Sequence, residues 1–207
     1  MLKTILRSIE YILNSIFPEP PIVKELKNLS GLDVIKKYGF YKKINETESF
    51  LPYSNNFVRE LISELKYFNN KDSARICGEI LLEKINLKNG DILVPIPLSK
   101  QRLKERGFNQ CEKICEIMIE ISKKDLIIST NNLIRTVNNK SQTNFKSDFE
   151  RAENILGIFK IKDCTNFREK NLILIDDVIT TGATLNEAIK EVLKCNPNSI
   201  KSFTISH

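Results

Sequence analysis

The chain has 207 residues but no tryptophan, and its one histidine, His207, is the last residue. A lone terminal histidine argues against a Ser-His-Asp triad and against a histidine-rich metal site, because both need histidines within the fold. Long apolar runs are also missing, and no segment offers the roughly 20 apolar residues of a membrane-spanning helix. We therefore expect no membrane span, and chemistry based on carboxylates, hydroxyls and cations.

Cysteine is present, but never as a C-x-x-C pair. The five cysteines are Cys77, Cys111, Cys115, Cys164 and Cys195. Cys111 and Cys115 would share one helical face, and no second pair completes a metal site. An odd count without a recognisable secretion signal favours a reducing compartment. We predict reduced cysteines that pack in the core and a cytoplasmic location.

Residues 1–50 contain few strong signals of a core. The first 17 residues, MLKTILRSIEYILNSIF, have apolar positions at helical spacing and predict an amphipathic helix docked on its own protein. A membrane-surface role is the alternative. Residues 22–50 are polar and mixed, so we predict a small arm with little core, followed by the main domain at 51–207.

From Asn55 onward, helical and extended patterns alternate. Helices are predicted in the segment after Asn55 and at 71–85, 107–122 and 184–195, and strands at 91–98, 125–129, 131–136, 155–161, 171–176 and 200–206. Such alternation favours an α/β fold with a parallel sheet covered on both faces. The net charge of +6 is spread evenly along the chain, which makes anionic partners plausible but is a weak signal for nucleic acid.

The segment ILIDDVITTGATL, residues 173–185, ends an apolar run with two adjacent carboxylates, Asp176 and Asp177. A strand of a parallel sheet delivers its last residues to the carboxyl edge, where ligands bind. The residues TTGAT follow at 180–184, where the next helix would begin, and the free N–H groups of a helix N-terminus attract phosphate. Because carboxylates accept hydrogen bonds from vicinal hydroxyls, the segment predicts a sugar-phosphate site with a divalent cation nearby.

Three other interpretations fit this segment less well. A Walker B strand also ends in acids, but the chain contains no G-x-x-x-x-G-K-[ST] loop. A receiver domain groups its acids near the start of the domain, whereas here little chain remains after them. An ordinary capped turn explains one acid and one threonine, but not the whole string.

The segment resembles the motif of type I phosphoribosyltransferases that binds 5-phosphoribosyl 1-pyrophosphate (PRPP). Four other segments are similar, in this order, to the competence-protein ComF family: LPYSNNFVRELISELKY, ILVPIPLSKQRLKERGFNQ, the stretch from Arg135 to Gln142, and RAENILGIFKI. The resemblance covers about residues 51–207. It implies a type I phosphoribosyltransferase fold, with a parallel sheet of about five strands flanked by helices and a small N-terminal helical arm.

The resemblance also implies roles for the residues at the carboxyl edge. Asp176 and Asp177 would be catalytic and bind the ribose hydroxyls, and the 5-phosphate would lie on Thr180, Thr181, Gly182, Ala183 and Thr184. A second loop at Pro97–Arg106 would bind pyrophosphate through Ser99, Lys100, Arg102 and Arg106. Arginine engages phosphate groups bidentately, which favours this assignment independently. The alternative is a solvated start of a basic helix.

Further candidates are Lys66, Gly107, Asn109, Gln110, Arg135 and Arg151. In the RGFNQ hallmark of the ComF family, Arg106 would contact phosphate, Gly107 would allow close backbone approach, and the Asn-Gln pair would orient the loop. Lys66 is either a ligand of the substrate or a partner of its helix dipole. The polar stretch 136–150 lies where these enzymes carry a flexible hood that excludes water.

The implied function is a PRPP-dependent phosphoribosyltransferase that uses Mg²⁺ with PRPP, has an unknown acceptor, and serves DNA uptake or nucleotide salvage. The alternative is a non-catalytic PRPP-binding accessory protein that acts through a partner in competence. A homodimer and a weak contact with single-stranded DNA are further expectations. ComF proteins often carry an N-terminal zinc module of two C-x-x-C pairs, but IFPEPPIVKELKNLS holds no cysteine. We therefore predict no zinc, and partners attributed to that module are in doubt.

Overall fold

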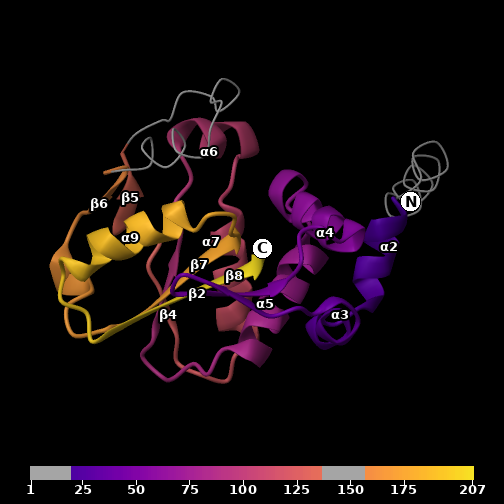
Figure 1. Ribbon diagram of the computed structural model, residues 1–207, viewed down its shortest axis with the longest axis horizontal. Coiled ribbons are helices and arrows are strands. Elements are labelled where there is room, and N and C mark those ends of the chain that lie inside the picture. Colours follow the sequence, from indigo (N-terminus) through magenta and orange to yellow (C-terminus); the bar gives the residue numbers. More distant parts are fainter. Residues whose placement is uncertain (1–19, 137–156) are drawn as a thin grey trace, which may run out of the picture.

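The computed structural model describes residues 20–136 and 157–207, and Figure 1 shows their arrangement. The predicted N-terminal helix, all of the polar stretch 136–150 except Thr136, and Arg151 lie outside the described residues. No helix of the two described ranges is both long and apolar enough to cross a bilayer.

A six-stranded sheet forms the centre of the molecule, in the order β1-β2-β8-β7-β3-β4. Its strands are β1 (Lys42–Ile44), β2 (Thr47–Leu51), β3 (Ile92–Pro95), β4 (Ile127–Ile128), β7 (Asn171–Val178) and β8 (Ser199–Ser206). Five of them run parallel, and β1 pairs antiparallel with β2 at one edge. The predicted α/β class with about five parallel strands is confirmed.

Helices cover both faces of the sheet. One face carries α2 (Pro21–Asn28), α3 (Gly31–Tyr38), α4 (Asn56–Tyr67), α5 (Lys71–Lys84) and α7 (Gln110–Ile121), and the other carries α9 (Ala183–Leu193) and the hairpin of β5 (Leu133–Arg135) and β6 (Phe159–Ile161). The central strand β7 contributes side chains to the two hydrophobic cores, one on each face of the sheet. Ile173 and Ile175 enter the core under α4, α5 and α7, while Leu172 and Leu174 enter the core under α9. Each buried side chain of this size contributes about 1.5–3 kcal/mol.

The prediction that residues 22–50 hold little core is wrong. Leu26 and Val34 are fully buried, and β2 lies inside the main sheet beside β8. Two buried hydroxyl side chains, Thr47 and Ser49, alternate along β2, and Thr47 Oγ1 lies 2.8 Å from Ser202 Oγ of β8. These polar residues made the strand unrecognisable in the sequence, because a buried strand is expected to be apolar. The described part of this arm is thus packed into the body that carries the site.

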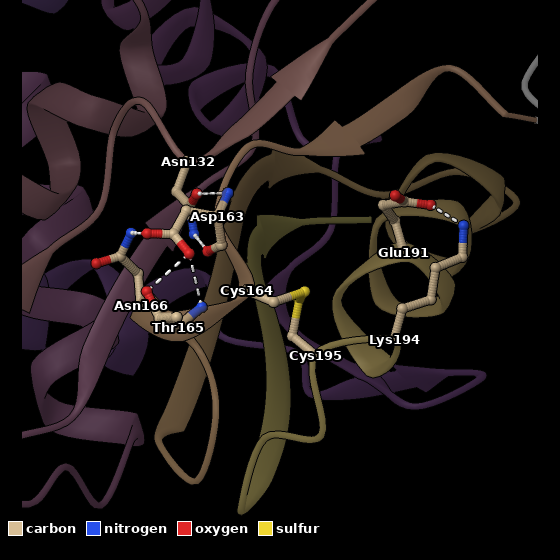
Figure 2. The surroundings of a disulfide bond; sticks show 8 residues. All are labelled: Asn132, Asp163, Cys164, Thr165, Asn166, Glu191, Lys194 and Cys195. Carbon is tan, nitrogen blue, oxygen red and sulfur yellow. Dashed lines mark hydrogen bonds and ion pairs between the residues drawn. A yellow bond between two sulfur atoms is a disulfide. The ribbon is translucent and has the colours of Figure 1, made fainter.

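The prediction that all five cysteines are reduced is wrong for two of them. Cys164 and Cys195 form a disulfide with a Cα–Cα distance of 4.9 Å, between the short helix η2 (Cys164–Asn166) and the residue two positions beyond α9 (Figure 2). The pair is 31 residues apart in the sequence, and the two cysteines meet because β6 packs against α9. The other three cysteines are free and buried, as predicted.

The Cys164 side of the disulfide is held by a small hydrogen-bond cluster. Asn132 and Asp163 exchange two bonds of 2.9 and 3.0 Å between amide groups and backbone, and the Asp163 carboxylate caps η2 through Thr165 N (Figure 2). The pKa of Asp163 lies below its usual value because of these bonds from Thr165. Cys164 therefore stands on a fixed turn opposite the end of α9.

Candidate functional site

The strand β7 brings Asp176 and Asp177 to the carboxyl edge of the sheet, as the sequence predicts. Because successive side chains of a strand point to opposite faces, the two acids have different surroundings. Asp177 is only 4% exposed and points toward α4 and α7, whereas Asp176 is partly exposed. The neighbouring strands β3 and β8 end at the same edge, at Pro95 and Ser206.

Asp177 belongs to a chain of side-chain contacts that we call the Asp177 network (Lys66, Arg106, Gln110 and Asp177). Its Oδ2 atom accepts a hydrogen bond of 2.9 Å from Gln110 Nε2 and lies 3.1 Å from Lys66 Nζ. Gln110 Oε1 accepts in turn from Arg106 Nη1 at 2.9 Å, and the Arg106 guanidinium lies 5.3 Å from the ring centre of Tyr67. The network joins three segments that are far apart in the sequence.

This geometry bears on two of the predicted residues. The sequence left Lys66 between a ligand and a helix-dipole partner, and the structure gives it an ion pair with Asp177 in which both side chains are largely buried. A buried carboxylate of this kind needs such a partner, because an unpaired charge in the interior is costly. Gln110 fixes the orientation of Arg106, so the guanidinium is presented rather than free to rotate.

Asp176 has a carboxyl group with a strongly shifted pKa. Although the side chain is partly exposed, desolvation by the protein packed around it is the main cause and the adjacent Asp177 charge is the second, and together they raise the pKa of Asp176 to about 7. The hydrogen bonds that it accepts from Asp177 N at 2.9 Å and from Cys111 Sγ at 3.4 Å act in the opposite direction. Asp176 therefore changes charge near neutral pH, and a hydroxyl donor or a cation would favour its ionised form.

The loop after β7 forms an open turn at the start of α9. Thr180 and Thr181 are exposed, and Gly182 is the N-cap of α9 with a φ of +79°. No side chain caps the helix in the described part of the chain, and the contact of Ala183 N with Thr181 Oγ1 is long, at 3.4 Å. The N–H groups of this first turn are thus available to an anion.

Asn45 supports this loop from the β1–β2 turn, and sequence reasoning missed it. Its Nδ2 atom donates to Thr181 O at 3.4 Å, and a Cβ atom added at Gly182 would lie 2.7 Å from the same nitrogen. Asn45 itself has a φ of +53°, a conformation that asparagine tolerates better than most residues. A turn-type asparagine was the one available signal, and it does not point to a site.

The predicted pyrophosphate loop lies at the end of β3 and continues into α6 (Lys100–Arg106). Ser99 caps this helix by accepting from Arg102 N at 3.2 Å, and Gly107 ends it in the left-handed conformation. Lys100 and Arg102 are exposed, and Arg106 is the basic residue of α6 that the Asp177 network fixes. The structure therefore brings Arg106 to the acids and leaves the other two cations in solvent.

Asn109 ties the base of this loop to the acids. It is 3% exposed, caps α7 by accepting from Cys111 N at 3.0 Å, and donates to Ile96 O at 3.1 Å. Ile96 N in turn donates to Ile175 O, the residue before Asp176. Asn109 and Gln110 thus both hydrogen-bond to residues of this loop, and the orienting role of the pair stays a prediction.

Arg135 lies at the end of β5, apart from the Asp177 network. Burial lowers the pKa of its guanidinium, and the Arg102 charge lowers it further, while Asp176 raises it. The described residues contain no group of three or more His, Cys, Asp or Glu side chains placed to hold a metal ion. The absence of zinc remains a prediction.

Parts of the sequence are similar to known proteins. Residues 129–206 match the phosphoribosyl transferase domain family. The chain is 40% identical over 117 residues to Competence protein ComFC of Bacillus subtilis, with 55% of this chain and 43% of the relative covered. It is 31% identical over 121 residues to Competence protein F of Haemophilus influenzae, covering 58% of this chain and 52% of the relative. The chain thus spans about half the length of these curated relatives.

Among solved structures, a hypoxanthine-guanine phosphoribosyltransferase of Bacillus anthracis aligns with a TM-score of 0.37 at 17% identity, over 71% of this chain and 66% of that one. The mostly parallel sheet and the domain match give the chain an α/β fold of the phosphoribosyl transferase kind. The chain is thus similar to the ComF competence proteins over a little more than half of its length, and residues 129–206 match a phosphoribosyl transferase domain.

Proposed function

We propose that this protein binds PRPP with Mg²⁺ and transfers its phosphoribosyl group to an acceptor. The observation that carries the proposal is the juxtaposition of a partly exposed carboxylate, Asp176, with an uncapped helix start at Gly182. A ribose 5-phosphate has hydroxyls for the first and a phosphate for the second. Thr180, Thr181 and Thr184 would add hydroxyl donors to the phosphate.

The pyrophosphate leaving group would also have partners in the site. In the transfer, the bond from C1 of the ribose to pyrophosphate breaks, and pyrophosphate keeps the electron pair. A bond forms from C1 to the acceptor atom, whose proton passes to solvent. Arg106, held by Gln110 at 2.9 Å, would engage the departing pyrophosphate by charge-assisted hydrogen bonds, and the exposed Lys100 and Arg102 of the same helix would add positive charge. Bound Mg²⁺ would lower the negative charge of that group, and carboxylate and phosphate oxygens are the ligands it prefers.

The cellular role belongs to the proposal as well. Relatives of this chain are named competence proteins and, in Escherichia coli, DNA utilization protein YhgH. We propose that the phosphoribosyl chemistry serves DNA uptake or nucleotide salvage in the cytoplasm. A competence protein partner, a weak contact with single-stranded DNA and a homodimer remain part of this proposal.

A second function is favoured by one specific observation. Asp177 Oδ2 is already bound by Lys66 and Gln110, so one of the two acids is engaged within the protein. An accessory protein that senses PRPP without turning it over would need the cradle but not a second free carboxylate. In this alternative the protein binds the same ligand, PRPP, but contacts a partner protein instead of catalysing a transfer.

The two functions are separated by incubating the protein with PRPP, Mg²⁺ and a panel of nitrogen bases and acids. An enzyme should release pyrophosphate only when the right acceptor is present, and the Asp176→Asn variant should lose this release. A sensor should bind PRPP in calorimetry and release no pyrophosphate with any acceptor. Lack of PRPP binding by the wild type would contradict both.

A further inference from the structure

A hollow lies between the start of α6 and the β5–β6 hairpin. Its volume is about 450 Å³. Apolar side chains, among them Leu98, Leu103 and Ile134, form part of its lining. Lys100, Arg135 and Lys162 add three cations, and Glu112 is the one carboxylate among the described residues of the lining. The hollow thus combines an apolar surface with an excess of positive charge.

Arg135 has a buried hydrogen-bond donor, its Nε atom, without an acceptor among the described residues. Its guanidinium lies 5.9 Å from the ring centre of Phe159 and experiences the repulsion of Arg102. A buried donor on a charged group without an acceptor is costly, and an anion bound to the guanidinium would offset part of the cost of burying its charge.

The apolar part of the lining also lacks a partner. Leu103 is 45% exposed, although it lies on the short helix next to the hollow. A flat ring placed against such a side chain would bury apolar area that is now in contact with water. Glu112 faces the same space, and burial raises the pKa of its carboxyl group. Its Oε1 atom accepts a long bond of 3.4 Å from Asn109 Nδ2, and a ring N–H donor would add a second bond to the carboxyl group.

The position of the hollow relates it to the acids. Asn109 lines it and also holds the backbone of Ile96, which is bonded to the strand that carries Asp176. The charge of Asp176 raises the pKa of Arg135, so the two groups interact electrostatically. A ligand bound to Arg135 would therefore lie within electrostatic reach of the acid that we assign to the ribose.

We propose that this hollow receives the acceptor substrate, and that the acceptor is a planar heterocyclic acid. Its carboxylate lies on Arg135 with Lys162 at the rim, its ring lies against Leu103, and its ring N–H donates to Glu112. The proposal rests on the proposed function, because an acceptor has meaning only where PRPP is bound. It adds the chemical class of the second substrate.

The experiment uses matched pairs of small molecules that differ in one carboxylate: orotate against uracil, and nicotinate against nicotinamide. Binding of each is measured on the full chain by ligand-observed NMR, and PRPP–Mg²⁺ affinity is measured separately by calorimetry. We expect the better acid to bind at least about tenfold more tightly than its neutral partner, since a charge-assisted hydrogen bond contributes that much. No preference for either acid would overturn the inference and leave the proposed function intact.

Two variants test the residues, with one matched control. Arg135→Gln should lose about tenfold in affinity for the acid and keep PRPP affinity within about twofold. Equal losses for acid and PRPP would overturn the inference and assign Arg135 to the pyrophosphate. Lys162→Glu, at an exposed position, covers the case in which Arg135→Gln does not fold, and it should also weaken the acid. Lys160→Gln removes an exposed charge outside the lining of the hollow and should change neither ligand.

A last outcome concerns the proposed function itself. If acids bind in an Arg135-dependent way but PRPP does not bind at all, the hollow is no acceptor site and the proposed function also fails. If PRPP binds and the preferred acid then stimulates pyrophosphate release, both stand.

Discussion

The two ends of the β7–α9 connection differ in how their polar groups are satisfied. At the acid end, Asp177 is buried and bound by Lys66 and Gln110, and the contacts continue to Arg106. At the helix end, five residues further on, Gly182 begins α9 without a side-chain cap and two threonines are exposed. The Asp177 carboxylate at the acid end is satisfied by protein groups. The N–H groups at the helix end have no side-chain cap among the described residues, so they can bind an anion.

This difference has a physical reason. A charge in the interior must be paired in the folded protein, because no ligand is present while the chain folds. Exposed backbone N–H groups can remain hydrated until a phosphate displaces the water. The acid end therefore serves stability as well as binding, whereas the helix end serves mainly binding. Mutations at the two ends should separate these properties.

The largest effect is expected from breaking the acid end. Asp177→Ala leaves Lys66 with a largely buried charge and no partner, so the free energy of unfolding should fall by about 3 kcal/mol. Urea denaturation measures this directly. The matched control is Glu46→Gln, which breaks the exposed ion pair with Lys43 and should cost less than about 0.5 kcal/mol. Equal losses for the two variants would show that Asp177 is not a buried, paired charge.

A comparable loss of stability should occur far from the ligand, at the other end of α9. Cys195→Ser removes the disulfide to Cys164, which closes a loop of 31 residues, and should cost about 3 kcal/mol under oxidising conditions. PRPP affinity should stay within about twofold, because the phosphate would lie at the opposite end of the helix. A reductant should lower the wild-type melting temperature and leave that of the variant unchanged. A wild type that ignores the reductant would show that the cysteines do not pair in solution.

Asp176 should give a smaller change with the opposite sign. Its pKa of about 7 in the folded state exceeds the unfolded value of about 3.9, so the native state keeps a proton that the unfolded state loses. Wild-type stability should therefore fall as the pH rises from about 4 to 7. Asp176→Asn should remove part of that fall and be more stable at pH 8, by on the order of 1–2 kcal/mol.

The same variant should bind PRPP more weakly, because an amide is a poorer acceptor for ribose hydroxyls than a carboxylate. Thermal unfolding over a pH series and calorimetry on the same samples measure the two effects. A variant that is less stable than the wild type at every pH would contradict the raised pKa.

The smallest loss of stability is expected at Gly182. A side chain there must adopt a positive φ, which costs about 1 kcal/mol, and must also displace the Asn45 amide. Gly90→Ala is the matched control, because Gly90 has a φ of +81° and open space around it. Gly182→Ala should lose somewhat more stability than Gly90→Ala because of the Asn45 contact, and only Gly182→Ala should lose PRPP affinity, by more than about tenfold. Equal PRPP affinity of the two variants would show that the phosphate does not bind at this loop.

The sequence was sufficient to predict the parallel sheet, because the strand at 171–178 and the helix after it have strong apolar periodicity. It also predicted that Asp176, Asp177 and the loop at 180–184 share one edge, since that follows from strand direction alone. The strand β2 escaped prediction because its buried face carries Thr47 and Ser49, whose partners lie about 155 residues away.

The remaining features depend on contacts between distant segments. Lys66 and Gln110 meet Asp177 only in the folded chain, and no local pattern states that a lysine at a helix end is an ion-pair partner. The disulfide was missed for the same reason, because Cys164 and Cys195 have no short spacing and are joined by the packing of β6 on α9. Local chemistry was predictable, and the pairing between segments was not.

The central claim is that the acid pair and the helix start together form a PRPP site. The most direct measurement is calorimetric titration of PRPP–Mg²⁺ into the wild type, into the double variant Asp176→Asn with Asp177→Asn, and into Asp163→Asn as an exposed control acid. The wild type and the control should bind PRPP alike, and the folded double variant should lose at least about tenfold in affinity. Unchanged affinity in the double variant would contradict the assignment of these acids to the ribose.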